Sequence, residues 1–219
     1  MKSLITLFFI ASMATGFVSC AQQSSQKENA KYAKEDLSKY SHATFAAGCF
    51  WHEEALFESV KGVQEAISGY AGGNAPNPNY EMVEDGNTGY AESVTVYYDP
   101  SKISYATLLK VSFAGQDPTS VNGQSPDFGS QYRSIAFYEN NSEKTQIEDY
   151  INQLIASKKY QGKITVEVTP LKKFWPAEAY HQDYIANNPN SGYVQNVSIP
   201  EIKKFQKQYP ELIKPGHFF

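Results

Sequence analysis

Cysteine is scarce in this sequence of 219 residues, which contains two, Cys20 and Cys49. These cysteines and the four histidines show no metal-ligand spacing, so no metal site is expected. The glycine-rich stretch 69–73 lacks the lysine and hydroxyl residue that would make it a phosphate-binding loop. Clustered Lys and Arg are also missing, and the formal net charge of -4 argues against a nucleic-acid-binding surface.

The composition is that of a globular protein. Hydrophobic residues make up 41% of the chain and aromatic residues 14%, including sixteen tyrosines, which is enough apolar material for one core. No internal repeat or low-complexity segment is visible. We therefore expect a single catalytic or binding domain over residues 42–219.

The N-terminus has the pattern of a targeting segment. Lys2 is followed by an apolar stretch, residues 4–18, which is too short and too often interrupted for a membrane span. Ser19 before Cys20 is typical of the end of a bacterial lipoprotein signal, in which the cysteine is acylated. The sequence predicts a signal peptide over residues 1–20 with a lipid anchor at Cys20. Simple cleavage and release is the alternative.

The next segment, residues 21–41, is rich in polar residues and is predicted to be a flexible tether. We expect an exported protein held at the cell envelope, in the periplasm or at the cell surface. If Cys20 carries lipid, Cys49 is the one thiol left in the mature chain. A single free cysteine in an exported protein is a candidate reactive group.

Strands and helices interleave along the domain without strict repetition. Apolar runs predict strands over residues 43–47, 62–69, 91–98, 132–139 and 164–168. Helical spacing predicts helices directly after Cys49, from Ser104 onward, and over residues 147–155, 177–186 and 202–208. Long loops span residues 74–89 and 115–129. The pattern indicates a two-layer α+β domain with one mixed β-sheet covered by helices, and we expect a ferredoxin-like plait.

Cys49 lies directly before the first predicted helix and after Gly48, which permits a tight turn. Unpaired backbone N–H groups and the positive end of the helix dipole at this place favour the thiolate, the nucleophilic form of cysteine. A small buried core residue is the alternative interpretation. The position makes Cys49 a candidate nucleophile.

Glu92 lies near the start of a strand whose side chains alternate between two faces, so it shares a face with Val94, Val96 and Tyr98. A carboxyl group at the head of an apolar face is partly desolvated, which raises its pKa and keeps it protonated. Glu92 is therefore a candidate proton donor. A solvated glutamate at a strand end is the alternative.

Further candidates are aromatic residues and one aspartate. Phe50 and Trp51 follow the cysteine and cannot both face the same core, so one or both could line an apolar pocket beside the sulfur. Tyr80 lies in the first long loop, Asp127 in the second, and Tyr132 at the start of the next predicted strand. Taken singly, each of these three is more simply a structural tyrosine or a turn aspartate.

Five motifs follow one another along the domain. They are Gly48-Cys49-Phe50-Trp51, Gly69-Tyr70-Ala71-Gly72-Gly73, Thr88-Gly89-Tyr90-Ala91-Glu92, Gly129-Ser130-Gln131-Tyr132-Arg133-Ser134 and Pro176-Ala177-Glu178-Ala179-Tyr180-His181-Gln182. Together they resemble the A-type peptide methionine sulfoxide reductases over nearly the whole domain. The resemblance implies a compact α+β fold and an enzyme that reduces the S-epimer of methionine sulfoxide, free or in proteins, and so repairs oxidised proteins.

The resemblance also implies roles for individual residues. Cys49 matches the family's nucleophile and Glu92 its carboxylic acid. Phe50 and Trp51 match the pocket that receives the methyl group of the sulfoxide. The position of Glu92 on an apolar strand face, which predicts a neutral proton donor, agrees with the role that the family implies.

Tyr80 and Tyr132 match the phenols that hydrogen-bond the sulfoxide oxygen in this family, and Asp127 matches a carboxylate that supports the same site. Two positions depart from the family pattern. His52 stands where glycine is usual, and Tyr90 stands where histidine is usual. Either departure could alter access to the pocket or the peptides that fit it.

Many members of the family carry resolving cysteines near the C-terminus, and this sequence has none there. Attack of Cys49 on the sulfoxide would leave a sulfenic acid, which an external thiol reductant such as thioredoxin must reduce. No bound cofactor is expected. The expected partners are oxidised proteins or free methionine sulfoxide, a thioredoxin-like reductant and, through the lipid anchor, a membrane. We expect a monomer.

The residues alone leave two other functions open. Cys49 with His181 or His52 could form a Cys-His hydrolase or transferase, although no oxyanion-hole signature is evident. The aromatic residues could instead serve a non-catalytic, lipid-anchored binding module. Replacing Cys49 by Ser separates the three functions. A reductase loses turnover and its sulfenic product, a hydrolase loses ester or amide cleavage, and a binding module keeps its affinity.

Overall fold

The computed structural model describes residues 31–219. The predicted signal peptide, the predicted lipidation site Cys20 and the first part of the predicted tether lie outside the described residues. Within the described range, no helix combines the length and the apolar character that crossing a bilayer requires.

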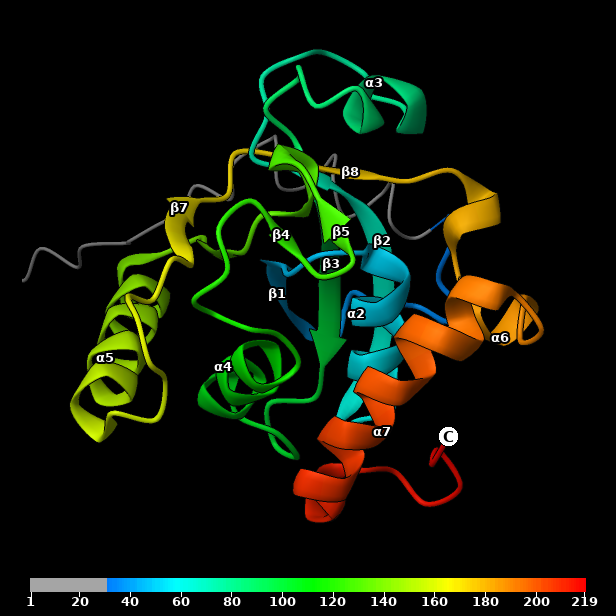
Figure 1. Ribbon diagram of the computed structural model, residues 1–219. Coiled ribbons are helices and arrows are strands. Elements are labelled where there is room, and N and C mark those ends of the chain that lie inside the picture. The colour runs from blue at the N-terminus through cyan, green and yellow to red at the C-terminus, as the bar shows by residue number, and fades with distance from the viewer. Residues whose placement is uncertain (1–30) are drawn as a thin grey trace, which may run out of the picture.

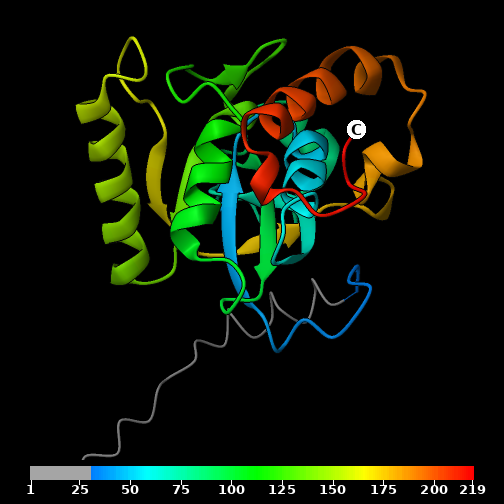
Figure 2. The same ribbon diagram turned by 90° about the horizontal axis from the view of Figure 1, so that it is seen from below.

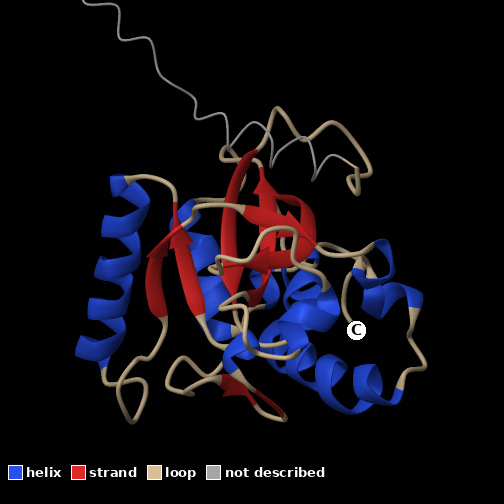
Figure 3. Ribbon diagram, turned by 90° about the horizontal axis from the view of Figure 1, so that it is seen from above, coloured by secondary structure: helices blue, strands red, loops and turns tan. Residues whose placement is uncertain are grey.

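A six-stranded sheet forms the centre of the protein (Figures 1 and 3). Its spatial order is β7 (Glu167–Pro170), β6 (Ile135–Tyr138), β1 (Ser41–Ala46), β3 (Ala91–Tyr98), β2 (Val63–Ala71) and β8 (Phe174–Pro176). β6 and β7 are parallel, and the other neighbouring pairs are antiparallel. The predicted α+β class with a mixed sheet is confirmed. The edge strands β7 and β8 extend the sheet beyond four strands, and the ferredoxin-like plait stays a prediction.

Helices cover one face of this sheet. α2 (Phe50–Glu58), α4 (Tyr105–Ala114) and α5 (Asn141–Ser157) pack there, and α7 (Ile199–Gln208) packs against α2 (Figure 2). Strand side chains alternate between the two faces, so every second apolar residue points to the helices. The core of this layer includes Phe45, Phe57, Val94, Leu108 and Ile147.

The opposite face of the sheet is covered in part by residues 31–40, which we call the N-terminal arm (blue in Figure 2). The flexible tether over residues 21–41 stays a prediction, and residues 31–40 of it lie against this face of the sheet. The apolar residues of the arm recur every few positions and are buried or half-buried on the sheet. The arm residues that pack there are Tyr32, Ala33, Leu37 and Tyr40.

The two long loops contain structure that the sequence did not predict. α3 (Tyr80–Glu84) lies within residues 74–89, and the Asn79 side chain caps it by accepting a hydrogen bond from the Met82 N–H. The hairpin of β4 (Gly123–Gln124) and β5 (Asp127–Phe128) lies within residues 115–129. Both loops are thus ordered around the residues that they carry.

The C-terminal third also differs from the prediction. Residues 177–186, predicted as one helix, form a 3-10 turn (Ala179–His181) and the short helix α6 (Tyr184–Asn187). A π-helical segment (Val194–Ser198) leads into α7. The strand β6 begins at Ile135, and Tyr132 lies in a 3-10 turn before it. The segments after residue 177 lie against the start of α2, where His181 contacts Phe50 and Tyr184 stacks on Trp51.

Candidate active site

The chain turns sharply between β1 and α2, and Cys49 lies at that turn. Gly48 has φ +84°, and a Cβ atom at this position would lie 2.8 Å from Cβ of Gln124. Only glycine fits such a backbone at such a close approach. The turn makes Cys49 the N-cap residue of α2 with its side chain partly exposed. The predicted position of Cys49 is confirmed.

The protonation of Cys49 differs from the prediction. Burial, with a contribution from the Glu92 carboxyl, raises the pKa of Cys49 well above its ordinary value. The Trp51 backbone N–H and the Tyr193 hydroxyl act in the opposite direction. The expectation that the helix end alone favours a thiolate is wrong, because desolvation outweighs it. The substrate-free site holds a thiol.

Glu92 is buried in β3 beside the first turn of α2. Its Oε2 accepts a 3.0 Å hydrogen bond from the backbone N–H of Phe50, the residue after Cys49. Burial raises the pKa of Glu92 well above its usual range; the Phe50 N–H opposes this shift, and the charges of Glu84 and Asp127 add to it. The carboxyl is thus held in its protonated form, the direction that the sequence predicts.

Phe50 and Trp51 belong to a cluster of aromatic rings. Phe50 is buried, with its ring centroid 4.9 Å from that of His181. The Trp51 indole stacks on Tyr184 at 3.6 Å and an interplanar angle of 7°, and meets the edge of Tyr193 at 5.9 Å. Its Nε1 donates a 3.0 Å hydrogen bond to Nδ1 of His181. The cluster gives the site an apolar side with a fixed geometry.

Tyr80 and Tyr132 approach the site from other elements. Tyr80 opens α3, with its ring centroid 4.5 Å from that of His181. The Tyr132 hydroxyl donates a 2.9 Å hydrogen bond to Oε2 of Glu84. Burial is the main cause that raises the pKa of both phenols. Both hydroxyls therefore keep their protons and can donate hydrogen bonds.

Tyr193 joins Cys49 to Asp127, and the sequence did not single it out. Its hydroxyl donates to Oδ2 of Asp127, and it also interacts with the Cys49 sulfur and lowers the pKa of that thiol. Burial raises the pKa of Asp127, while the hydrogen bond from Tyr193 acts against the shift. Asp127 is thus linked to the sulfur through one hydroxyl group. Glu84 is a second group that the sequence analysis missed.

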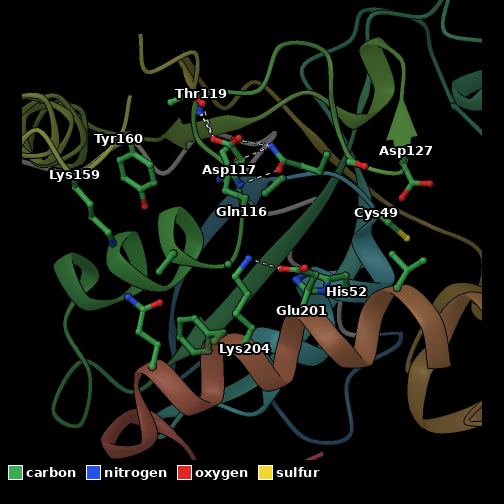
Figure 4. A pocket seen from close by; sticks show the side chains of 18 of the residues that line it. Cys49, His52, Gln116, Asp117, Thr119, Asp127, Lys159, Tyr160, Glu201 and Lys204 are labelled. Atoms are coloured by element: carbon green, nitrogen blue, oxygen red, sulfur yellow. Dashed lines mark hydrogen bonds and ion pairs between the residues drawn. The ribbon is translucent and has the colours of Figure 1, made fainter. Parts of the chain in front are cut away.

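A polar cavity of about 590 Å³ opens beside Cys49 (Figure 4). Cys49 and Asp127 lie at one end of it, and Lys159 and Tyr160 at the other. His52, one of the two departures from the family pattern, contributes to the wall. Burial lowers the pKa of its imidazole, which is therefore neutral at pH 7. His52 thus shapes the cavity as an uncharged group.

Tyr90, the other departure, is a packing residue. Its side chain is buried, and its hydroxyl donates a 2.7 Å hydrogen bond to the carbonyl of Ala75. The ring lies so close to Gly73 that a Cβ there would come within 2.3 Å of it. Tyr90 therefore fixes the glycine-rich segment after β2.

The geometry argues against a hydrolase built on His181. Nδ1 of His181 accepts the Trp51 indole N–H, which places the proton of the neutral imidazole on Nε2, so neither nitrogen has a lone pair free to act as a base; burial also lowers the pKa of His181 to about 4. The His181 imidazole is hydrogen-bonded to the Trp51 indole and is not available to deprotonate the Cys49 sulfur. Contacts and charge interactions connect the predicted site residues that the structure describes: Cys49, Phe50, Trp51, Tyr80, Glu92, Asp127 and Tyr132.

Comparisons with known proteins agree with this site. The family model described as peptide methionine sulfoxide reductase matches residues 41–213. The chain is 44% identical over 172 residues to peptide methionine sulfoxide reductase MsrA 1 of Rhodopirellula baltica, covering 78% of this chain and 88% of that protein. It is 42% identical over 173 residues to MsrA of Thermus thermophilus, covering 79% and 97%.

Solved structures show the same similarity. Mxr1 from Saccharomyces cerevisiae in its reduced form superposes with a TM-score of 0.67 at 32% identity, covering 74% of this chain and 92% of that one. Methionine sulfoxide reductase A of Corynebacterium diphtheriae gives a TM-score of 0.63 at 31% identity, covering 70% and 77%. Fold, sequence and site agree, and the chain belongs to the peptide methionine sulfoxide reductase family of thiol-dependent oxidoreductases.

Proposed function

We propose that this protein reduces methionine-S-sulfoxide, free and in proteins, to methionine, with Cys49 as the nucleophile. One observation carries the proposal. A partly exposed thiol lies beside a buried, protonated carboxyl, and the Phe50 N–H ties the two together. A sulfoxide needs both a nucleophile for its sulfur and a proton for its oxygen.

The aromatic cluster supports the binding of the substrate's methyl group. The Phe50 and Trp51 rings follow Cys49 directly in the chain, with their centroids 6.4 Å apart, and the indole is held by Tyr184 and His181. A methyl group on this side leaves the sulfoxide oxygen to the opposite, hydrogen-bonding side of the site. This arrangement would select one of the two sulfoxide epimers.

The polar side of the site supports activation of the oxygen. Glu92 is protonated by burial, and Tyr80 and Tyr132 keep their hydroxyl protons. Hydrogen bonds from these groups would withdraw electrons from the S–O bond and make the sulfur electrophilic. Glu92 supplies the proton that the oxygen requires as the S–O bond breaks.

The Cys49 proton also has a path from the sulfur. The Tyr193 hydroxyl interacts with the sulfur and donates to Asp127, so a lone pair of its oxygen can accept the thiol proton while its own proton shifts to the carboxylate. The resulting thiolate attacks the sulfoxide sulfur. Oxygen passes to Cys49, two electrons pass to the substrate, methionine leaves, and a sulfenic acid remains.

Recycling requires two external thiols. The first condenses with the sulfenic acid to give a mixed disulfide and water, and the second releases the Cys49 thiol and an external disulfide. Cys20, the other cysteine of the sequence, lies outside the described residues. A thioredoxin-like protein, which carries two thiols, suits this role, and the reaction needs no bound cofactor.

Export and lipid anchoring at Cys20 form a separate proposal. The apolar stretch 4–18 and the Ser19-Cys20 pair support it. Mass spectrometry of the N-terminal peptide from membrane and soluble fractions tests it. A diacylglyceryl-modified Cys20 in the membrane fraction is the expected result, and an unmodified N-terminus in the soluble fraction contradicts it.

A single-turnover experiment tests the reductase. The full-length protein is mixed with S- or R-methionine sulfoxide without reductant, and the protein mass and the methionine formed are measured. We expect one methionine per protein and one added oxygen on Cys49 with the S-epimer alone. Cys49→Ser should lose both signals, and Cys20→Ser should keep both. Turnover without oxidation of Cys49, or equal use of both epimers, contradicts the proposal.

A further inference from the structure

Trp51 is held in place by one short segment, residues 181–184. His181 accepts the indole N–H at 3.0 Å, and Tyr184 stacks on the indole ring at 3.6 Å. Between them, the Gln182 amide bonds to both backbone groups of Ser68 at 3.0 Å. The position of the proposed methyl-binding surface therefore depends on how this segment is fixed.

Asp183 is the point of strain in the segment. Its φ of +51° and ψ of +30° lie in the left-handed region, which is uncommon outside glycine, although aspartate and asparagine adopt it more readily than other residues. Its backbone N–H interacts with the buried carboxyl of Glu54 and lowers the pKa of that group, against the effect of burial. Its Oδ1 accepts a 2.7 Å hydrogen bond from Nζ of Lys34, in the N-terminal arm. These contacts hold a conformation that the backbone alone disfavours.

Lys34 is anchored by more than one acidic group. Its Nζ also lies 3.6 Å from Oε1 of Glu65 and 3.7 Å from Oε1 of Glu58, and its backbone N–H donates to Glu65 at 3.3 Å. Partial burial alone lowers the pKa of Lys34, but the hydrogen bond to Asp183 and the surrounding carboxylates raise it above its ordinary value. The ammonium group is the cation on which these carboxylates converge.

The arm is an addition to the family domain in this chain. The family model begins at residue 41, whereas the arm covers residues 31–40. The arm packs on the sheet with its apolar residues, Leu37 being buried, and this packing places Lys34 at Asp183. A lysine outside the matched domain thus contacts the segment that holds the substrate pocket.

We propose that Lys34 is a positioning residue for the substrate pocket, acting through Asp183 on His181, Tyr184 and so on Trp51. The arm is then a clamp that fixes the aromatic wall of the site. This inference rests on the proposed function, because it assigns the clamped indole to the pocket that receives the substrate's methyl group. Loss of the clamp weakens substrate binding and leaves the chemistry at Cys49 in place.

Kinetics of full-length Lys34→Ala test the clamp. We expect KM for methionine-S-sulfoxide to rise about threefold to tenfold with kcat within about twofold, because an interaction shared by ground and transition state is lost. Lys34→Arg should restore KM. Lys39→Ala is the matched control: Lys39 is in the same arm, is 60% exposed against 62% for Lys34, and pairs with Glu35 of the arm itself.

A second readout does not depend on activity. The sequence has two tryptophans, so in a Trp175→Phe background the fluorescence reports on Trp51. We expect acrylamide to quench Trp51 more strongly in Lys34→Ala than in the parent or in Lys39→Ala. Asp183→Asn keeps a residue that tolerates the left-handed conformation. If Lys34 acts through Asp183, adding Lys34→Ala to this variant should not increase the quenching further.

The outcomes separate the inference from the proposed function. If the parent protein reduces no sulfoxide, the proposed function fails, and the quenching still decides whether the clamp exists. A lower melting temperature with unchanged KM and unchanged quenching makes the arm a stabilising element only and overturns the inference. Equal effects of Lys34→Ala and Lys39→Ala, or no effect of either, overturn it as well.

Discussion

The carboxyl group of Glu92 and the backbone N–H of Phe50 are joined by a 3.0 Å hydrogen bond that ties β3 to the first turn of α2. Oε2 of Glu92 accepts this bond. In a protonated carboxyl, the oxygen without the proton is the better hydrogen-bond acceptor. The Glu92 proton therefore belongs on Oε1. The nucleophile, Cys49, and the residue that binds the acid, Phe50, are thus neighbours in one turn of the chain.

Replacing this acid should slow the reaction without weakening substrate binding. We expect Glu92→Gln to lower kcat about 100-fold to 10,000-fold, the usual range for a lost general acid, with KM changed little. Because burial raises the pKa of Glu92, the parent should lose its proton donor, and with it kcat, as the pH rises through that pKa. Steady-state kinetics across pH measure both effects.

The Gln variant should lack the alkaline decline that depends on this carboxyl. Glu148→Gln, on the solvent side of α5, is the control and should keep the parent profile. A Glu92→Gln variant with the parent kcat would remove Glu92 from the mechanism.

The hydroxyl of Tyr193 should control how readily Cys49 ionises. It lowers the pKa of Cys49, against the burial that raises it, so Tyr193→Phe should move the ionisation of the thiol to higher pH. The pH dependence of Cys49 alkylation by iodoacetamide measures this directly. Tyr209→Phe, which removes a hydroxyl bonded to the Gln208 amide, should leave it unchanged. A shift to lower pH in Tyr193→Phe would contradict the proposed contact.

Gly48 should tolerate no side chain. Gly48→Ala combines a left-handed backbone with a Cβ contact of 2.8 Å to Gln124, and we expect a loss of about 1–3 kcal/mol in unfolding free energy together with a lower kcat. Gly216→Ala is matched in backbone, with φ +80°, but has no atom within 4 Å. It should lose about 1 kcal/mol with the parent kcat. Denaturant titration and kinetics of the two variants separate the cost of the left-handed backbone, which both share, from the cost of the close contact with Gln124, which only Gly48→Ala has.

Glu53 should make the protein less stable as the pH rises. It is buried, neither carboxyl oxygen has a hydrogen-bond partner among the described residues, and burial raises its pKa well above the ordinary 4.5. The folded state binds its proton more tightly than the unfolded state does. The stability that Glu53 contributes is therefore complete below about pH 4.5 and is lost as the pH rises through the folded-state pKa.

Replacing Glu53 by an apolar residue of similar length removes this penalty. We expect Glu53→Met to raise the unfolding free energy at pH 8 by about 1–3 kcal/mol and to reduce its dependence on pH. Glu148→Met, at an exposed position paired with Lys144, should change stability by less than about 0.5 kcal/mol. Urea titrations at several pH values make the comparison. A steeper loss of stability with pH in Glu53→Met would refute this account.

The placement of Cys49 and Glu92 could be predicted because local patterns define it. An apolar run that ends at Gly48 and continues as a helix puts Cys49 at a helix start, and period-two alternation puts Glu92 on the core face of its strand. The resting thiol could not be predicted, because the helix-end effect is local whereas desolvation depends on distant segments that pack over the turn.

Tyr193 and the arm escaped prediction for a related reason. Tyr193 precedes a π-helical segment whose sequence shows no regular spacing, and only the folding of that segment over α2 brings its hydroxyl to Cys49. The arm is polar on average, and its four apolar residues become informative once the face of the sheet that they cover is known. The polar composition of the arm predicts a flexible segment, whereas its packing against the sheet determines its conformation.

Both edges of the central sheet are short and end in proline. β7 has four residues and ends at Pro170, and β8 has three and ends at Pro176. A proline has no N–H to offer a new strand, and so few free backbone groups give an extended chain little to pair with. Oxidised, partly unfolded polypeptides can thus bind at the sulfur without pairing as extra strands with the edges of the sheet, a step that leads to aggregation.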